Sequence, residues 1–545
     1  MRPARLLAAV AVVALLAASF IPPSALVRVG ERLTGRGGLE VVTVEALGEL
    51  PWLLRALAAL AAAWLVLHPA LAAPAGERDR PRAFAPILAL AALGTILALL
   101  VRALVLREGL ISGDEWNNEF TALLFAGGRL WDTPPPHPDF FRFTYFVTQP
   151  DRTFSIFPPL WPAVLALGHL LGIGAAINAL VAGAAALLVG AWNRGRGAAL
   201  AATAGLVLSP MFVFTAASSF AGPTVLACLM GTLLCLRRAL EAPPARATSW
   251  MAAAGVLWGL CFAAHYPTAI GAGLPPLVAA AWWIARAGGG ARPAFAALAT
   301  AAVPLAALGA YHHALHGGAP WVLPASLYEA SMIRGAGLDP GTLLRGAAYT
   351  ALHAVRLLGW TLPLLPFLAL LAPRGDKAPA GNRLLVLSIA GLVAFYVFYP
   401  SAGGPQYGPR YWFGLLGPLA VLAGQGALRL LATPRGRAYA ALLLAGAMAL
   451  LGVRARLEQA RAARENAPFR LAEGARLDHA IVFMKNVNRA DHARNAPGWS
   501  GPVLFVPDLG DRNAEMRALA PGRAVWLYRR TPDGPELRPE VVVPP

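Results

Sequence analysis

The acidic residues of this chain are concentrated in one stretch, residues 107–160, which holds Glu108, Asp114, Glu115, Glu119, Asp132, Asp139 and Asp151. Asp114 and Glu115 are adjacent and come shortly after an apolar segment. Glu119 follows Glu115 by one helical turn if a helix begins here. A carboxylate placed there can deprotonate an incoming hydroxyl, so Asp114 and Glu115 are candidate catalytic residues. Two carboxylates can also help to hold a divalent cation.

A structural role for the same residues is the alternative. The first turn of a helix leaves backbone amides without partners, and a Ser or Asp side chain at the N-cap accepts hydrogen bonds from them. Ser112 or Asp114 can serve as this cap. The pattern alone therefore leaves Asp114 either as a general base or as a cap.

Further candidates lie at the ends of apolar segments. His265 and Tyr266 stand in a Pro-containing turn after one such segment, and Tyr407, Arg410 and Tyr411 stand before another. A guanidinium offers a fork of N–H donors that suits a phosphodiester. Alternatively, Arg410 only extends to lipid headgroups, and His265 is a solvated residue at the membrane interface.

Composition indicates which solvent these segments face. Of the 545 residues, 57% are hydrophobic and only 14% are charged, and the mean hydropathy is +0.56. A soluble domain carries about 25% charged residues. We therefore expect an integral membrane protein, and the soluble, disordered and collagen-like classes are excluded.

Charge is distributed unevenly along the chain. Residues 454–545 hold 15 basic and 11 acidic residues, whereas the 453 residues before them hold 31 and 17. This contrast predicts a membrane domain over 1–453 and a soluble domain over 454–545. The net charge of +18 therefore does not indicate a nucleic-acid partner, because the excess is not gathered in one soluble patch.

Thirteen apolar segments are candidate membrane-spanning helices. They cover approximately residues 6–27, 51–73, 84–106, 175–192, 198–215, 223–236, 250–264, 268–285, 293–315, 349–371, 384–398, 411–431 and 438–453. The first is alternatively a signal peptide, because a basic start precedes it. Arg and Lys counts in the short loops favour a cytoplasmic N-terminus, and an odd number of spans then places the C-terminus outside.

Residues 454–545 have the pattern of a small extracytoplasmic α/β domain. Their apolar runs at 480–484, 502–506 and 524–528 are short and rich in Val, Phe and Trp, as strands are. A helix is expected over 511–519, with Asp511 as its N-cap. We find no catalytic combination of residues in this part of the sequence.

Four motifs occur together between residues 111 and 453. They are Asp114-Glu115, the run Phe157-Pro158-Pro159-Leu160-Trp161-Pro162, the Gly-rich segment 254–268 that ends in His265-Tyr266-Pro267-Thr268, and Arg410-Tyr411. Their combination resembles the GT-C membrane glycosyltransferases, especially bacterial relatives of the protein O-mannosyltransferases and aminoarabinose transferases. In that family an Asp-Glu pair opens the first large outside loop. Here Phe157 and Trp161 replace tyrosines, and His265 and Tyr266 stand where a basic residue is usual.

The resemblance implies a GT-C-like, all-α polytopic fold in the bacterial inner membrane. It also implies transfer of a sugar from a polyprenyl-phosphate donor to an extracytoplasmic glycan, lipid or protein acceptor. Asp114 and Glu115 are then the expected catalytic residues. The expected substrate-binding residues are Glu119, Asp139, Asp151, His265, Tyr266, Tyr407, Arg410 and Tyr411. The expected partners are membrane lipids and the donor and acceptor, with no nucleic acid; the sugar, the acceptor and any metal requirement do not follow from the sequence.

A transporter or flippase for a lipid-linked sugar is the alternative function. Transporters often contain two repeated halves and ionisable residues within their spans. This sequence shows no internal repeat, and its acidic residues gather in a loop. A scaffold whose C-terminal part binds a partner is a third possibility. Of the three, a glycosyltransferase is favoured.

Overall fold

The computed structural model describes residues 84–141, 145–317, 337–362, 365–373, 381–399, 403, 406–485, 495–499 and 501–540, together with Pro51, Leu54 and Ala58. The predicted span at 6–27 lies outside these residues, as does that at 51–73 apart from the three isolated positions. The choice between a first span and a signal peptide therefore remains a prediction.

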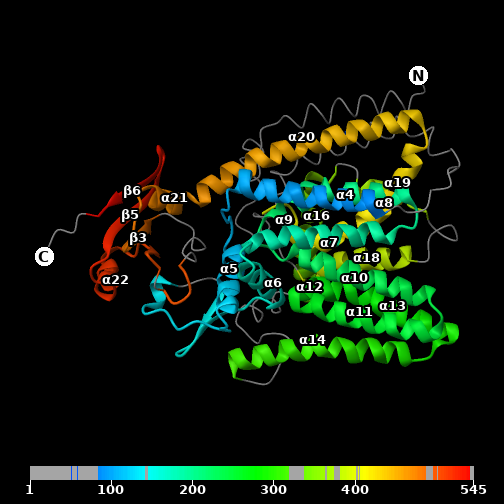
Figure 1. The fold of residues 1–545 in the computed structure, drawn as a ribbon, viewed down its shortest axis with the longest axis horizontal. Coiled ribbons are helices and arrows are strands. Elements are labelled where there is room, and N and C mark those ends of the chain that lie inside the picture. Colours follow the sequence, from blue (N-terminus) through cyan, green and yellow to red (C-terminus); the bar gives the residue numbers. More distant parts are fainter. Residues whose placement is uncertain are drawn as a thin grey trace.

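Long apolar helices form the body of the protein (Figure 1). Within the described residues, eight are long and apolar enough to cross a membrane: Phe84–Leu106, Gly174–Trp192, Gly222–Glu241, Pro244–Ala264, Tyr266–Gly289, Arg292–His316, Arg410–Leu431 and Pro434–Glu465. A ninth is present if Arg196–Val207 and Pro210–Ala217, which meet at 59°, form one bent span. Each coincides with a predicted span. The chain is a mostly helical, multi-pass membrane protein.

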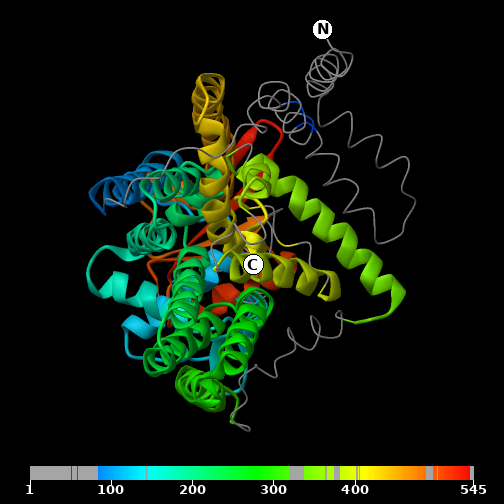
Figure 2. The same cartoon turned by 90° about the vertical axis from the view of Figure 1, so that its right-hand side faces the viewer.

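The spans correspond to the following elements in chain order: α4 (Phe84–Leu100) with η1 (Val101–Leu106), η3 (Gly174–Ala176) with α7 (Ile177–Trp192), α8 (Arg196–Val207), α9 (Pro210–Ala217), α10 (Gly222–Glu241), α11 (Pro244–Ala264), α12 (Tyr266–Thr268) with η4 (Ala269–Gly273), α13 (Leu274–Ile284) and η5 (Ala285–Gly289), α14 (Arg292–His316), η7 (Arg410–Leu415) with α19 (Leu416–Leu431), and α20 (Pro434–Glu465). Figure 2 views this body from the end opposite the C-terminal sheet.

Two predicted spans differ in the structure. Segment 349–371 is not one helix, because α16 (Pro340–Trp360) ends at Trp360 and α17 (Leu365–Leu370) begins after a break. Segment 384–398 forms α18 (Asn382–Phe398), whose 17 residues fall short of the roughly 20 that a span needs. The described residues thus contain eight or nine clear spans, and the predicted total of thirteen stays a prediction.

Glycines allow some spans to approach closely. A Cβ on Gly255 of α11 would collide with the Ala297 carbonyl of α14, and one on Gly424 of α19 would press against the backbone of α8. Lipid tails are as apolar as leucine, so helices in a membrane gain stability from close packing of small residues. The contacts between these neighbouring helices therefore depend on the absence of a side chain.

The segment between α4 and α7 forms its own set of elements. They are α5 (Gly113–Ala126), η2 (Pro138–Phe140), the antiparallel strands β1 (Phe146–Thr148) and β2 (Thr153–Ser155), and α6 (Leu160–Leu170). Ser112 is the N-cap of α5, since its Oγ accepts a hydrogen bond from the Glu115 amide at 3.3 Å. α5 packs against α6, so this segment is folded onto the ends of the spans.

The C-terminal part forms a four-stranded sheet in the order β4-β3-β5-β6. Helix α20 continues past Val453 to Glu465 and leads through α21 (Ala467–Gly474) into β3 (Ala480–Lys485), β4 (Val503–Pro507), β5 (Ala524–Thr531) and β6 (Gly534–Pro539). Strand β3 is parallel to β4 and β5, and β5 pairs antiparallel with β6. Helix α22 (Asn513–Leu519) follows the 3-10 turn η9 (Gly510–Arg512), so Arg512 takes the N-cap position predicted for Asp511. The sheet and α5 lie at the same end of the helical body (Figure 1).

Candidate active site

A cavity opens between α5, the start of α6 and the ends of several spans. It encloses about 1060 Å³ of empty space, open space at its mouth included. Its wall is mostly apolar and aromatic, and its polar members include Asp114, Asn118, His265, Tyr266, Thr268, Tyr396, Tyr399, Arg410 and Tyr411. A concave apolar site with a few converging polar groups is the usual form of a small-molecule binding site. Five of the ten residues predicted to form the site, Asp114, His265, Tyr266, Arg410 and Tyr411, line this cavity.

An ion pair between Asp114 and Arg410 lies in the cavity wall. Asp114 Oδ2 is 2.5 Å from Arg410 Nη1, and the two side chains are 15% and 12% exposed. The guanidinium of Arg410 also lies over the rings of Phe220 and Tyr411, 4.8 and 5.5 Å from their centroids. Such cation–π contacts stabilise a guanidinium that is partly shielded from water. Two groups about 300 residues apart in the sequence are thereby brought together on one wall.

Asp114 is not the cap of α5. Ser112 fills that role, so the Asp114 carboxylate is left to face the cavity. The Tyr145 hydroxyl donates a hydrogen bond to Asp114. Burial, followed by the negative charge of Asp114, raises the pKa of Tyr145 well above its ordinary value, so Tyr145 stays a donor at neutral pH. Of the two roles that the sequence left open, the structure assigns the cap to Ser112.

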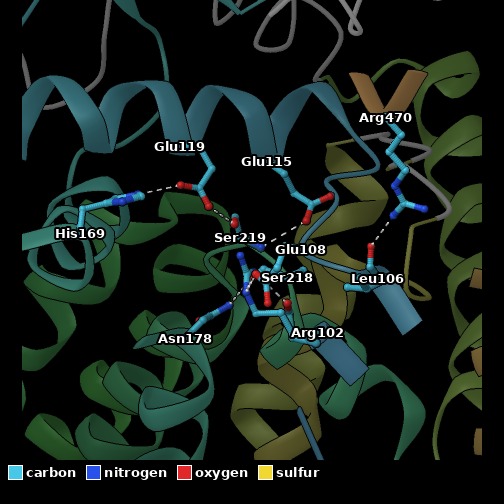
Figure 3. Close-up of polar contacts among 11 residues, drawn as sticks. Arg102, Leu106, Glu108, Glu115, Glu119, His169, Asn178, Ser218, Ser219 and Arg470 are labelled. Carbon is cyan, nitrogen blue, oxygen red and sulfur yellow. Dashed lines mark hydrogen bonds and ion pairs between the residues drawn. The ribbon is translucent and has the colours of Figure 1, made fainter. Parts of the chain in front are cut away.

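Glu115 and Glu119 lie on a different face of α5 from Asp114, and the catalytic and binding roles expected of them stay predictions. Glu115 is fully buried and accepts hydrogen bonds from the backbone amides of Ile111 at 3.0 Å and Ser219 at 3.2 Å. Glu119 bonds with the Ser219 hydroxyl and lies 2.8 Å from His169 Nε2 (Figure 3). Neither residue lines the cavity. Both side chains hold the turn before α10 against α5. Glu115 accepts from a buried amide that would be costly to leave without a partner, and Glu119 bonds with a hydroxyl of the same turn.

Burial has a direct effect on the charge of Glu115. Removing its carboxylate from water raises the pKa of Glu115 to about 7, although the two backbone hydrogen bonds act in the opposite direction. A raised pKa means that folding favours the neutral acid. The stability contributed by neutral Glu115 is therefore complete below its ordinary pKa of about 4.5 and is lost as pH rises through about 7.

Three other predicted binding residues lie away from the cavity. Asp139 pairs with Arg512 at 2.9 Å, and Asp151 pairs with Arg152 at 2.5 Å, both at the surface. Tyr407 is fully buried and stacks on Phe214, with ring centroids 5.8 Å apart. The side chains of Asp139, Asp151 and Tyr407 are used in surface ion pairs and in the core, and the binding roles expected of them stay predictions.

Comparison with known proteins gives matches among solved structures alone; no protein-family model and no curated protein matches the chain. The chain is similar to ArnT from Cupriavidus metallidurans, solved with bound undecaprenyl phosphate: identity is 14% and the TM-score 0.47, over 82% of this chain and 92% of ArnT. It is also similar to the archaeal oligosaccharyltransferase AglB from Archaeoglobus fulgidus, solved with an inhibitory peptide and a dolichol-phosphate (12%, 0.44, 84% and 75%). A third is the arabinofuranosyltransferase AftD from Mycobacteria (18%, 0.44, 79% and 33%).

Sequence reasoning missed several residues that shape the cavity. Asn118 Nδ2 and Trp161 Nε1 both line it and both donate to the Ser219 carbonyl oxygen, at 2.9 and 2.8 Å. Tyr396 stacks on Tyr411 with ring planes 3° apart and centroids separated by 5.9 Å. Asn118 follows Asp114 by four residues, and that spacing on one helix face was a usable signal. The contacts of the Ser219 amide and carbonyl had no such signal, because every residue carries these backbone groups.

A metal site is not evident in the described part of the chain. No group of three or more His, Cys, Asp or Glu side chains that could hold a metal ion occurs there. Among the described residues, Asp114 is the one carboxylate in the cavity wall, and it faces a guanidinium. These residues do not provide the set of oxygen ligands that a divalent cation needs.

Proposed function

We propose that this protein is a membrane glycosyltransferase that moves a sugar from a polyprenyl-phosphate donor to an acceptor hydroxyl outside the cytoplasm. The observation that supports it most is the Asp114–Arg410 pair within one cavity at the ends of the spans. A carboxylate can take a proton from a hydroxyl, and a guanidinium can bind a phosphate. The sequence motifs that resemble the GT-C family include both residues.

The chemistry assigns a separate task to each residue. The acceptor oxygen forms a bond to the anomeric carbon while the bond from that carbon to the donor's phosphate oxygen breaks. The hydroxyl proton passes to Asp114, and the phosphate leaves with the electron pair of the broken bond. Arg410 stabilises the charge on the leaving phosphate, as preorganised donors do in a partly dry site. No acid is required, because a phosphate leaves as an anion.

The cavity wall suits a donor that carries both a lipid chain and a sugar. Phe157 and Pro158 before α6 and Trp161 in its first turn line this space, together with Val225 of α10 and Phe413 of η7. An apolar wall of this kind can bury a lipid chain, and aromatic faces pack well against the apolar faces of a sugar ring. A nucleotide sugar would need no such wall. This contrast supports a lipid-linked donor.

The proposal is tested with the full chain, purified and reconstituted in proteoliposomes. A panel of polyprenyl phosphate sugars is supplied together with an extract of bacterial envelope glycans and lipids. We expect free polyprenyl phosphate to appear, with the sugar on an acceptor, for one member of the panel. Movement of labelled donor across the bilayer without release of polyprenyl phosphate would instead identify a flippase and contradict the proposal.

A further inference from the structure

We propose that the C-terminal sheet is a positioning element for the catalytic helix α5, and that Trp499 is its principal positioning residue. The inference rests on the proposed function, since it assigns to the sheet the task of holding Asp114 where the reaction needs it.

Helix α5 presents different faces to three surroundings. Asp114 and Asn118 face the cavity, while Glu115 and Glu119 hold the turn that contains Ser219. A third face packs against the C-terminal part through two buried side chains, Phe120 and Leu124, in a cluster with Ile481, Phe483, Trp499, Leu504, Val506 and Met516. The helix is therefore enclosed between the cavity on one side and the sheet on another.

Trp499 makes the central contact of the third face. Its ring centroid lies 5.6 Å from that of Phe120 and 5.0 Å from that of Phe141, and the side chain is only 7% exposed. Its indole Nε1 donates to the Thr133 carbonyl oxygen at 2.9 Å. Trp499, in the connection from β3 to β4, thus joins the C-terminal part both to α5 and to the segment that follows α5. A buried aromatic cluster with a satisfied polar group fixes orientation as well as distance.

A buried carboxylate strengthens the same attachment. Asp132 is fully buried, and its Oδ2 accepts from the Gly498 amide at 2.5 Å. Its Oδ1 accepts from the Thr133 amide and pairs with Arg129, each at 2.9 Å. A buried charge that lost one of these partners would be costly, so the segment after α5 is held firmly to residues 498–499.

The N-terminal end of α5 is held by the C-terminal part as well. Asn466, between α20 and α21, donates from Nδ2 to the Leu110 carbonyl oxygen at 3.0 Å, two residues before the cap of α5. Trp116, in the first turns of α5, packs against Phe469 of α21 with ring centroids 6.3 Å apart. Both ends of the helix that carries Asp114 are therefore fixed by residues after 465.

The same residues have no place at the cavity itself. Within the described chain, the wall of this cavity includes nothing beyond Gly414. Arg410 lies at the start of η7, which contacts α9, α10, α18 and α19. Loosening the sheet should therefore displace Asp114 while the phosphate ligand Arg410 stays in place. The expected signature is a fall in kcat with little change in the KM for the donor.

The first experiment measures kcat and donor KM for the reconstituted full chain carrying Trp499→Ala. Trp282→Ala is the matched control, because Trp282 is 53% exposed on α13 and lies outside both the cavity lining and the contacts of α5 with the C-terminal part. We expect Trp499→Ala to lower kcat about 10²-fold, as a misplacement of about 1 Å can, with donor KM within a few-fold and Trp282→Ala near the parent. Phe120→Leu, which weakens the same contact from α5, should show the same split if Trp499→Ala fails to fold. An unchanged kcat for a folded variant would overturn the inference.

A double-mutant cycle separates positioning from general destabilisation. If Trp499 acts through Asp114, then adding Trp499→Ala to Asp114→Asn should cost little further activity, whereas independent effects would multiply. Multiplying losses would overturn the inference. Trp499→Phe, which keeps an aromatic side chain but loses the hydrogen bond to Thr133, should restore part of the kcat. Full activity of Asp114→Asn would contradict the proposed function, whereas an inactive Asp114→Asn with a fully active Trp499→Ala would overturn this inference alone.

Discussion

Asp114 and Arg410 neutralise each other within a half-dry cavity. Their charges are opposite and their side chains are mostly buried, so removing either one leaves the other without its partner. An anionic donor can compete with Asp114 for the guanidinium, and the carboxylate is then available to an acceptor hydroxyl. The two residues are therefore expected to fail in different ways when they are changed separately.

Arg410→Ala should weaken use of the donor. Loss of a charge-assisted contact to phosphate costs about 1.5 to 3 kcal/mol, or about 10- to 100-fold in donor kcat/KM. Arg345→Ala is the control, because Arg345 is exposed on α16 and bonds with Thr342 Oγ1 at 3.0 Å outside the cavity lining. Steady-state kinetics with a polyprenyl phosphate sugar measures both. Equal kcat/KM for the two variants would contradict the role of Arg410 in binding the donor phosphate.

Which residues of the site could be predicted follows from helix geometry. Asp114 and Arg410 were found from residue type and from their place at the ends of apolar segments. Glu115 points away from the cavity that Asp114 lines, because neighbours on a helix point about 100° apart. Asn118, four residues after Asp114, lies on the same face of α5 and also lines the cavity. Contacts made through the backbone of Ser219 leave no trace in the side-chain pattern.

At the scale of elements, the close approach of α16 and α18 predicts that a side chain added at their contact destabilises the protein. A Cβ on Gly346 of α16 would collide with the carbonyl oxygen of Val397 in α18. Gly346→Ala should therefore lower the thermal midpoint of the detergent-solubilised protein by several degrees, since overpacking costs about 1 to 3 kcal/mol. Gly452→Ala on α20 is the control, with open space around it; Ala favours a helix by about 1 kcal/mol over Gly. A midpoint for Gly346→Ala at or above that of Gly452→Ala would contradict this packing.

The elements themselves were predictable to differing degrees. Apolar length located nearly every helix of the body, because lipid imposes that length. It failed at 349–371, where the segment around Thr361 interrupts the helix. The start of α16 carried a signal that was overlooked: Asp339 precedes Pro340 and accepts from the Thr342 amide at 2.9 Å, the pattern of an N-cap followed by Pro.

At the scale of the whole molecule, α5 and the C-terminal sheet share one end of the helical body (Figure 1), and α5 also contributes Asp114 and Asn118 to the cavity wall. The sequence could predict strands after residue 480 from composition. It could not predict that they dock on α5, because Phe120 and Trp499 meet across almost 380 residues and neither position is unusual locally. Long-range packing of this kind is visible only in the folded chain.

The numbers of Arg and Lys residues in the short loops predict the orientation of the protein in the membrane. Ala245, exposed at the start of α11, should be cytoplasmic, and Ala518, exposed on α22, should be outside. In intact cells, a membrane-impermeant thiol reagent should label Ala518→Cys and spare Ala245→Cys. The parent is the control, because its described cysteines are buried or half-buried. Labelling of Ala245→Cys alone would show that the orientation is the opposite of the predicted one.

Turnover of Asp114→Asn tests the central claim most directly. Asn keeps the shape of the side chain but cannot take a proton, and removal of a general base typically costs about 10²- to 10⁴-fold. Asp533→Asn, at an exposed turn between β5 and β6, is the matched control. We predict that the reconstituted Asp114→Asn protein loses at least about 10²-fold in sugar transfer while Asp533→Asn keeps the parent rate. Transfer by Asp114→Asn within a few-fold of the parent would contradict the catalytic role of Asp114 and, with it, the proposed site.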